Sequence, residues 1–198
     1  MTSAAPRRGR RPGAPDTRAA ILVAARSLFA EQGYAGTSVR AVASAAGVDA
    51  ALVHHYFGTK DDLFIAALEL PVDPRSVVRP VVEGGVDGAG ERLMRLFVSV
   101  WDDEQTRTPL LALVRGILEP GGQQLIQDGF LRMVLGPVGA GLGLDDPDRR
   151  LPLVASQLVG LVLLRYVVGV EPLASMPADD LVAVYAPTVQ RYLTGPLP

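Results

Sequence analysis

Residues 37–60 read TSVRAVASAAGVDAALVHHYFGTK. The hydroxyl of Thr37 is expected to cap a first helix over residues 37–46, which Gly47 then breaks. A second helix is predicted over residues 49–57. Two short helices joined by a tight glycine turn are typical of a helix-turn-helix, whose second helix is narrow enough to enter the major groove of DNA.

The apolar residues of this stretch fall on the faces that the two helices turn toward each other. The residues predicted to pack there are Val39, Val42, Ala43, Ala46, Val48, Leu52, Val53 and Phe57. Small side chains suit this interior, because the two helices must approach closely. The residues left facing outward are the candidate N-cap Asp49 and Ala50, Ala51, His54 and His55.

Helical spacing continues on both sides of this stretch. Upstream, a helix that starts at Asp16 and ends at Gly33 places Ile21, Ala25, Leu28 and Phe29 on one face. Downstream, residues 59–62 read Thr-Lys-Asp-Asp, a capping box for a fourth helix that runs to Leu70. Residues 16–65 are therefore predicted to form a helix-turn-helix domain.

The first fifteen residues differ in composition from the rest of the chain. Residues 1–15 carry Arg7, Arg8, Arg10 and Arg11 among prolines and glycines, and such a composition forms no packed element. The prediction is a flexible basic arm. It either enters a narrow minor groove of DNA or is a solvated tail.

The remaining two thirds also read as helices interrupted by proline and glycine. Apolar spacing predicts helices over residues 91–102, 110–119, 123–135, 151–170 and 181–193, with a kink at Pro187. Loops are expected over residues 71–90, 102–108, 119–122, 136–149 and 171–178. No stretch alternates apolar and polar residues with a period of two. The predicted fold class is therefore all-α, with a second helical domain over residues 66–198.

Residues 151–170 are apolar enough to raise the alternative of a membrane span. Four residues interrupt them: Pro152, Ser156, Gln157 and Arg165. An uncompensated arginine near the centre of a span costs about 2.5–3.5 kcal/mol, and a helix that is apolar on all sides is also expected where several helices bury it. A subunit interface formed by residues 151–170 and 181–193 is therefore favoured over a membrane span.

Composition excludes several functional classes. With 48% hydrophobic and 20% charged residues, the 198-residue chain can build a core and is not predicted to be disordered. It contains no cysteine, which rules out disulfides, a thiol nucleophile and cysteine-ligated metal sites. The first residues lack the apolar segment of a secretory signal, so the expected location is the cytoplasm.

The charge is distributed unevenly along the chain. The formal net charge is −2, yet residues 1–60 carry eight basic and three acidic side chains, and residues 61–198 carry eleven basic and 18 acidic ones. A basic first third followed by an acidic remainder predicts that the first third meets a polyanion.

The motifs of residues 16–65 resemble those of the TetR family of bacterial transcriptional repressors. The matching string is Gly33-Tyr34-Ala35-Gly36-Thr37-Ser38-Val39-Arg40, then Val42-Ala43, Ala46-Gly47-Val48, Tyr56-Phe57-Gly58 and Lys60, with Leu63 and Phe64 after it. Thr17-Arg18, Ala24-Ala25 and Leu28-Phe29 fit the first helix of that family. The resemblance implies a DNA-binding regulator that is not an enzyme: a homodimeric, ligand-responsive repressor of a palindromic operator.

The resemblance also implies roles for individual residues. Thr37 and Ser38, and Lys60 at the start of the fourth helix, are expected to meet phosphates. Arg40 occupies a position from which a guanidinium reaches a base edge. The residues that end the recognition helix, where the family contacts sugar and phosphate, are His54, His55 and Tyr56.

This chain departs from the family at the start of the recognition helix. Asp49, Ala50 and Ala51 offer mostly methyl groups, which touch a thymine methyl but donate no hydrogen bond. Specificity is therefore expected to depend on Arg40, on a histidine and on the shape of the DNA.

Each of these residues has an alternative interpretation. Thr37 caps a helix whatever the chain binds, and an exposed Arg40 is most often simply solvated. His54 and His55 invite a metal or catalytic role, but adjacent helical side chains point about 100° apart and chelate one ion poorly. Lys60, the sole lysine, is harder to explain by solvation, because the helix dipole disfavours a cation there.

Members of the family typically enclose a ligand pocket among the middle helices. The candidate lining residues in this chain are Met94, Phe97, Trp101, Leu113, Arg115, Phe130 and Met133. Such an aromatic and methionine stripe is more often plain core, and that alternative stays open. The implied mechanism is a population shift, in which a small apolar inducer draws the dimer off DNA through residues 59–70.

Two other classes of function remain. An enzyme is the first, but the acidic runs at residues 102–104 and 145–148 lack the spacing of a calcium loop. The glycines at residues 139–143 lack the preceding strand of a dinucleotide site, so neither a metal nor a cofactor is predicted. A DNA-independent dimeric binding module is the second class, and it predicts no salt-dependent retention of DNA.

Overall fold

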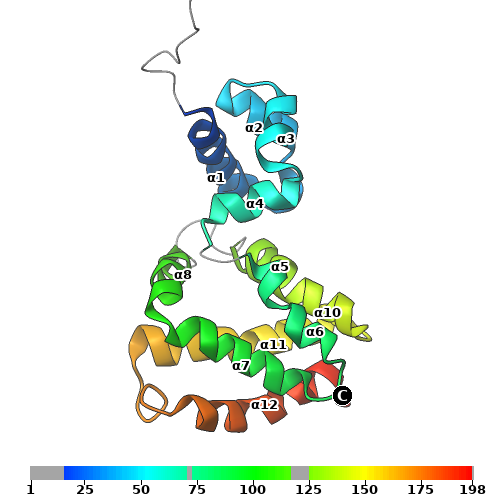
Figure 1. Ribbon diagram of the computed structural model, residues 1–198, viewed down its shortest axis with the longest axis vertical. Coiled ribbons are helices and arrows are strands. Elements are labelled where there is room, and N and C mark those ends of the chain that lie inside the picture. Colours follow the sequence, from blue (N-terminus) through cyan, green and yellow to red (C-terminus); the bar gives the residue numbers. More distant parts are fainter. Residues whose placement is uncertain (1–15, 71–72, 117–124, 198) are drawn as a thin grey trace, which may run out of the picture.

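The structure is a computed structural model that describes residues 16–70, 73–116 and 125–197; at residues 116, 125, 126 and 130 it describes the backbone alone. The regular elements in these ranges are all helices, which confirms the predicted fold class (Figure 1). The N-terminal domain contains α1 (Thr17–Gly36), α2 (Val39–Ala46), α3 (Ala50–Phe57) and α4 (Lys60–Leu68). The C-terminal domain contains α5 (Pro74–Val77), α6 (Arg79–Glu83), α7 (Ala89–Asp102), α8 (Glu104–Gly116), the π-helix η1 (Leu125–Leu135), α10 (Gly136–Leu142), α11 (Pro147–Leu161), the π-helix η2 (Val162–Val168) and α12 (Ala178–Thr194).

The N-terminal helices pack around a small aromatic core. Phe29 and Tyr34 of α1 meet the Phe64 ring of α4 edge-on, with centroid separations of 4.8 and 5.3 Å. The other buried members are Ile21, Leu22, Ala25, Val42, Ala43, Val53, Phe57, Leu63 and Ala67, together with Met133 from η1. The inward positions predicted for Val42, Ala43, Val53 and Phe57 are confirmed, and the other predicted contacts of α2 and α3 are half-buried.

Helix α1 is interrupted where the sequence predicts its end. Asp16 caps its start, because its Oδ1 accepts the N–H groups of Arg18 at 3.1 Å and Ala19 at 3.4 Å. At Gly33 the backbone has φ 69° and ψ 176°, a conformation that a residue with a Cβ avoids. The regular helix therefore stops at this glycine, and one further turn follows before Thr37.

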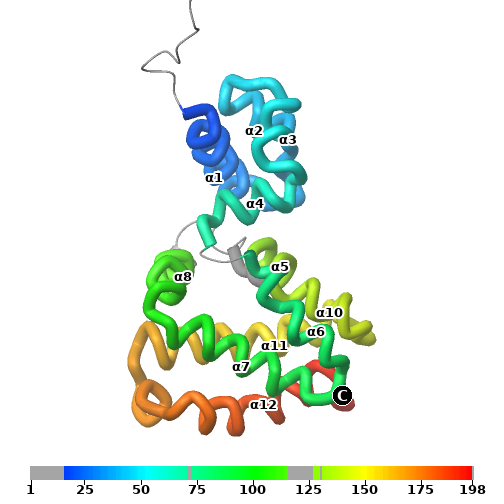
Figure 2. Tube along the Cα trace, in the orientation of Figure 1, coloured from blue at the N-terminus to red at the C-terminus, as the bar shows by residue number. Residues whose placement is uncertain are grey.

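The core of the C-terminal domain lies where α7, α11 and α12 pack together. Helices α7 and α12 run side by side (Figure 2). Gly90 permits this approach, because a Cβ there would lie 2.6 Å from the carbonyl oxygen of Ala186. Its N–H donates to the side chain of Gln190 at 2.8 Å. Large side chains then fill the space between the helices, with Met94, Leu161, Leu181 and Leu193 fully buried.

Three of the predicted loops contain helices. Residues 71–90 include α5 and α6, and residues 136–149 include α10 and the start of α11. Prolines break a helix pattern when they lie inside it, but Pro74 stands in the first turn of α5, where its missing N–H and fixed φ suit the helix. Residues 102–108 include the start of α8, whose first turns are too polar for apolar spacing to detect.

The remaining expectations for loops and helix ends have mixed outcomes. The loop expected over residues 171–178 is present, and the loop expected over residues 119–122 lies outside the described residues. Helix α4 ends at Leu68 rather than Leu70, because Glu69 adopts a left-handed conformation with φ 52°. Helix α12 includes Pro187 and continues to Thr194.

Helices α11 and η2 together form the long apolar helix Pro147–Val168. By length and composition alone it could cross a membrane, and 33% of its most apolar window is buried in the chain. It crosses the C-terminal domain, with α11 against both η1 and α12. The domain thus covers one part of the surface of this helix. The other part is apolar and exposed in the single chain.

Candidate nucleic-acid interface

Three caps fix both ends of α2 and the start of α3. The Oγ of Ser38 accepts the N–H of Ala41 at 3.1 Å, at the start of α2. Gly47 ends α2 in the left-handed conformation, with φ 68°, which glycine adopts without strain. Asp49 Oδ1 then accepts the N–H of Ala51 at 2.7 Å, which confirms Asp49 as the N-cap of α3. The two helices therefore begin and end as a helix-turn-helix requires.

Thr37 does not cap α2, contrary to the prediction. Thr37 is 1% exposed, and its hydroxyl lies 2.8 Å from the carbonyl oxygen of Gly33 and 3.0 Å from that of Leu28. The hydroxyl is therefore used at the interrupted end of α1, where helical carbonyl groups need donors. The N-cap is Ser38, one residue later. Thr37 positions α2 against α1 from the interior.

The outward face of α2 and α3 carries most of the predicted contact residues. The exposed ones are Ser38, Arg40, Asp49, Ala51, His54, His55 and Tyr56, and Ala50 is half-buried. Phe57 packs inward as predicted, with the guanidinium of Arg18 at 5.3 Å from its ring centroid. Helix α3 thus presents alanine methyl groups near its start and polar aromatic side chains near its end.

His54 has a structural contact in addition to its exposed position. Its Nδ1 lies 2.7 Å from the carbonyl oxygen of Gly58, beyond the end of α3. Because a carbonyl only accepts hydrogen bonds, Nδ1 carries a proton and Nε2 is the nitrogen left for another partner. In the part of the chain that the structure describes, no group of three or more His, Asp or Glu side chains is arranged to hold a metal.

Lys60 is half-buried at the start of α4. Its Nζ lies 4.1 Å from the ring centroid of Tyr34, whose hydroxyl is hydrogen-bonded to Asp61. Burial and the neighbouring guanidinium of Arg132 lower the pKa of Lys60. Burial and the bond with Asp61 raise the pKa of Tyr34 to about 12. The aromatic face gives the ammonium a partner where the helix dipole alone opposes it.

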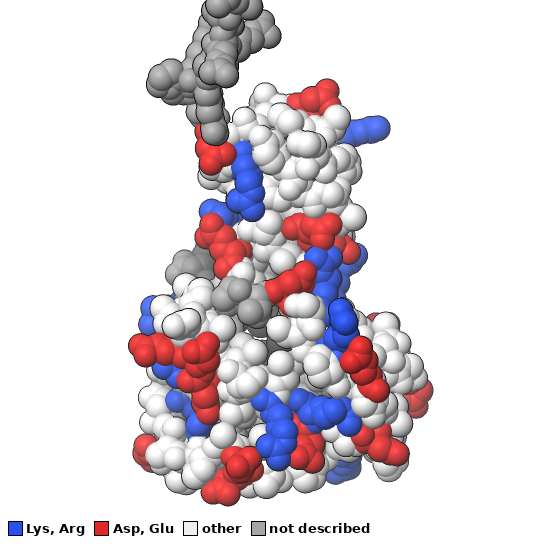
Figure 3. All heavy atoms as spheres, viewed as in Figure 1, with Lys and Arg blue, Asp and Glu red and all other residues white. Residues whose placement is uncertain are grey.

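The basic excess of the first third lies mainly in the N-terminal arm. Of the eight basic side chains in residues 1–60, four belong to residues 1–15, which lie outside the described residues. Arg26 forms an ion pair with Glu69 and donates to the carbonyl oxygen of Ala67 at 2.9 Å, so it braces α1 against the end of α4. Basic and acidic side chains are intermixed over the face shown in Figure 3.

A second candidate site is an apolar cavity of about 140 Å³ in the C-terminal domain. It is lined by Leu70, Pro74, Val77, Val78, Leu93, Leu96, Phe97, Val100, Trp101, Leu110, Val134, Leu135 and Leu158. These side chains are apolar, so the cavity favours a hydrophobic occupant. Phe97 and Trp101 are the predicted pocket residues that line it.

Two family models match the chain. Residues 21–67 match the bacterial regulatory proteins of the tetR family, and residues 87–193, more than half of the chain, match the tetracyclin repressor-like C-terminal domain. The chain belongs to the TetR family. This is a family of DNA-binding transcriptional regulators and not of enzymes.

Several known proteins are similar to this chain. The HTH-type transcriptional regulator HbdR of Aromatoleum sp. is 32% identical over 115 residues, which cover 57% of this chain and 50% of HbdR. The HTH-type transcriptional repressor Rv3405c of Mycobacterium tuberculosis is 49% identical over 57 residues, 29% of this chain and 30% of the repressor. The matches thus span half or less of these curated relatives. A solved TetR-family regulator from Streptomyces coelicolor is 41% identical, with a TM-score of 0.47, and the match covers 93% of this chain and 98% of that one.

Four of the other residues predicted for the pocket of this TetR-family chain do not line the cavity. Met94 is fully buried in the C-terminal core, and Met133 is buried in the N-terminal core instead. Leu113 is half-buried and Arg115 is exposed, both on α8. The side chain of Phe130 lies outside what the structure describes. Part of the cavity lining comes from α5, within a segment where a loop is expected, so apolar spacing does not predict these residues.

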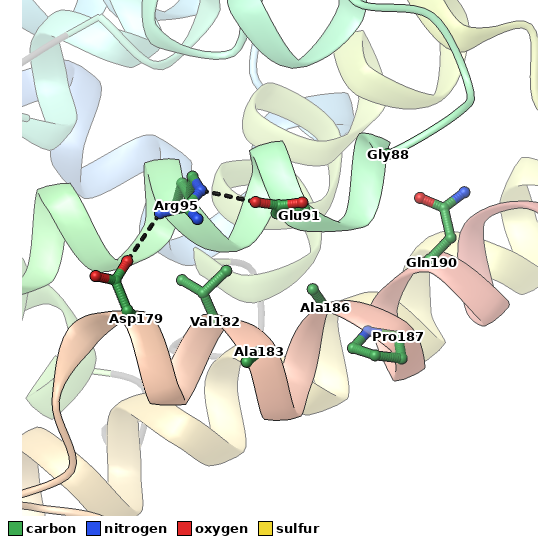
Figure 4. Close-up of a pocket in the computed structure, with 9 residues that line it drawn as sticks. All are labelled: Gly88, Glu91, Arg95, Asp179, Val182, Ala183, Ala186, Pro187 and Gln190. Atoms are coloured by element: carbon green, nitrogen blue, oxygen red, sulfur yellow. Dashed lines mark hydrogen bonds and ion pairs between the residues drawn. The ribbon is translucent and has the colours of Figure 1, made fainter.

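A surface groove of about 370 Å³ follows α7 and α12 of the C-terminal domain (Figure 4). Arg95 bridges Glu91 at 2.9 Å and Asp179 at 3.0 Å there. Val182 and Pro187 of α12 line the same groove. Because two carboxylates already neutralise the guanidinium, the groove is a poorer ligand site than the apolar cavity.

Proposed function

We propose that this chain acts in the cytoplasm as a homodimeric repressor that binds a palindromic operator and is released by a small, largely apolar inducer. The observation that carries the proposal is the exposed outward face of the capped helix α3. One such helix makes too few base contacts for specific binding. Two of them one turn of DNA apart, about 34–36 Å, fit a palindrome and combine their affinities.

The proposed contact surface assigns different roles to its residues. Ser38 has an exposed hydroxyl at the start of α2 and is proposed to contact a phosphate. The hydroxyl of Thr37 is buried, so Thr37 is proposed to affect DNA binding only by holding α2 in place against α1. Arg40 is proposed to read a base edge, and Lys60 to meet a phosphate. Residues at the start of α3 (Asp49, Ala50 and Ala51) and at its end (His54, His55 and Tyr56) complete the proposed surface.

The proposed dimer rests on an exposed apolar surface. Leu164, Val167 and Val168 of η2 are 45%, 46% and 66% exposed, and Val184 of α12 is 60% exposed. Large apolar side chains exposed to this extent on η2 and α12 are the expected sites of contact with a partner. We infer that residues 151–170 and 181–193 of two chains pack as a four-helix bundle around a two-fold axis.

A membrane span fits this surface less well than a partner subunit. Arg150 is 6% exposed and donates to the carbonyl oxygens of Tyr192 and Gly195, both at 3.0 Å. Arg165 donates to the carbonyl oxygens of Leu173 and Met176 at 2.6 and 2.8 Å. Two arginines on the long apolar helix are thus held by the rest of the domain, which would have to unpack for that helix to enter a bilayer.

The apolar cavity supports the proposed class of inducer. Its volume of about 140 Å³ is close to that of an engineered cavity of about 150 Å³ that holds benzene, and below the roughly 300–1,000 Å³ of ordinary ligand pockets. A larger apolar ligand therefore has to separate the elements that line the cavity. Leu70, which follows α4, is one of these lining residues, so such a ligand acts on the helix that starts at Lys60.

A mobility-shift assay with the DNA upstream of its own gene tests DNA binding. We expect retention that is specific for one fragment, that weakens as salt rises, and that comes from a dimer by light scattering. A DNA-independent binding module would instead be a dimer that retains no fragment. A monomer, or equal retention of unrelated fragments, contradicts the proposal.

The inducer is tested through Trp101, the sole tryptophan, because it lines the cavity. Apolar compounds that change the emission of Trp101 are expected to release the retained DNA fragment. The inducer part of the proposal is wrong if compounds that occupy the cavity leave the affinity for DNA unchanged.

A further inference from the structure

Helix η1 belongs to the C-terminal domain but is shared by the two candidate sites. Val134 and Leu135, near its end, line the apolar cavity. Met133, the residue before them, is 4% exposed and is buried in the N-terminal core with Phe29 and Phe64. Consecutive side chains of one helix therefore touch the proposed inducer cavity and the interior of the DNA-binding domain.

A hydrogen bond ties η1 to α1 as well. The break at Gly33 leaves the N–H of Tyr34 at the start of a new helical turn, where a backbone donor has no partner within its own helix. Asp128 of η1 accepts this N–H with its Oδ2 at 2.6 Å, in a partly buried position. The carboxylate of Asp128 thus caps a helical turn that belongs to the other domain.

The ring of Tyr34 connects this contact to the proposed DNA surface. The guanidinium of Arg132, on η1, lies 4.0 Å from the ring centroid, and the Nζ of Lys60 lies 4.1 Å from it. A cation this close to an aromatic face is held by the ring quadrupole, and more strongly where water is excluded. Arg132 of η1 and Lys60 of α4 therefore both contact the ring of Tyr34.

We infer that η1 couples the apolar cavity to DNA binding, with Asp128 and Arg132 acting as positioning residues for Lys60 through Tyr34. This inference rests on the proposed function and adds a path by which a ligand in the cavity changes the DNA-binding surface. A ligand that displaces Val134 or Leu135 moves a helix whose other side chains hold Tyr34. The signal then reaches the DNA surface without passing along the whole of α4.

Coupling between two sites is reciprocal, which allows a test without a known inducer. If η1 transmits changes from the cavity to Lys60, then DNA bound at Lys60 shifts η1 and alters the cavity. Trp101 lines the cavity with Val134 and Leu135, so its emission reports this change. Emission of Trp101 is therefore expected to change when the full chain is saturated with the fragment that it retains.

The variants Asp128→Ala and Arg132→Ala, alone and together, test the route. The matched controls Asp87→Ala and Arg79→Ala remove the same charges from exposed positions of the same domain. Each variant is first shown by its thermal unfolding to be folded and by mobility shift to retain the fragment. We expect the emission change of Trp101 at saturating DNA to fall to less than half in the η1 variants and to persist in both controls.

The possible failures are distinguishable. If the unsubstituted chain retains no DNA, the proposed function fails and the coupling through η1 fails with it. If the chain retains DNA but the emission of Trp101 does not change, the coupling is wrong while DNA binding stands. If the η1 variants respond as fully as the controls, transmission does not pass through Asp128 and Arg132.

Discussion

Arg40 is exposed near the start of α2, where a guanidinium has the reach to contact a guanine edge. We predict that Arg40→Ala weakens operator binding by about 1–3 kcal/mol, with a smaller loss on a scrambled duplex. Arg40→Lys is the control, because it keeps the charge but not the two-pronged donor. Competition binding on both duplexes measures the effect. Equal losses on the two sequences would assign Arg40 to the phosphate backbone instead.

Lys60 is predicted to contribute charge rather than sequence recognition. The variant Lys60→Met keeps aliphatic packing on Tyr34 and removes the ammonium. We expect weaker binding to every duplex and a slope of log affinity against log salt that is shallower by about one. Titrations at several salt concentrations measure this slope. An unchanged slope would show that Lys60 makes no phosphate contact.

Thr37 and Ser38 show how far single residues can be predicted from sequence. Both have a side chain suited to an N-cap, and local pattern alone does not choose between them. The choice is made by the broken end of α1, whose carbonyl groups draw the hydroxyl of Thr37 inward. The outward residues of α3 were predictable, because the helical period and the glycine turn fix that face locally.

At the scale of the element, the capping box of α4 predicts a dependence of stability on pH. The hydroxyl of Thr59, then the guanidinium of Arg75 and the backbone N–H of Thr59, lower the pKa of Asp62 to about 2. A lowered carboxyl pKa stabilises the folded state above the unfolded value of about 3.9, and the stabilisation is lost as pH falls toward the folded value. Acid therefore weakens the start of α4.

The variant Asp62→Asn tests this dependence. At neutral pH we expect it to lower the free energy of unfolding by up to about 1 kcal/mol, typical of a helix cap, since the pair with Arg75 is exposed and adds little. The difference in Tm between the two proteins should shrink below about pH 4 and vanish near pH 2. A difference that stays constant over this range contradicts the role of the charge.

Helix η1 shows why part of the lining of the apolar cavity was not predictable. A helix over residues 123–135 follows from apolar spacing, but in a π-helix the hydrogen bonds run from i to i+5, so side chains leave the faces that a 3.6-residue period assigns. Met133 accordingly enters the N-terminal core instead of the cavity, while Val134 and Leu135 line the cavity. Phe97 and Trp101 were predictable because α7 is a regular amphipathic α-helix.

At the scale of the whole molecule, the exposed apolar surface of η2 is the part of the proposed dimer interface that joins two copies of the DNA-binding helix α3. Leu164 is 45% exposed, and in the proposed dimer it is covered by the partner. Burying a leucine side chain contributes about 1.5–3 kcal/mol, and a two-fold axis applies any substitution twice. A carboxylate at this position would have to be buried without a partner, which a dimer does not tolerate.

We therefore predict that Leu164→Glu converts the dimer to a soluble monomer of 20.9 kDa and abolishes specific retention of the operator. Light scattering and a mobility shift on the same preparation measure the two effects. Val86→Glu is the control, because Val86 is 43% exposed but lies before α7 and outside the proposed interface. We expect the dimer and the retention of the operator to be lost together, because two α3 helices combine their affinities for DNA only when they are joined in one dimer. A Leu164→Glu variant that remains dimeric would place the interface elsewhere, and a monomer that retains full affinity would show that one reading helix is enough.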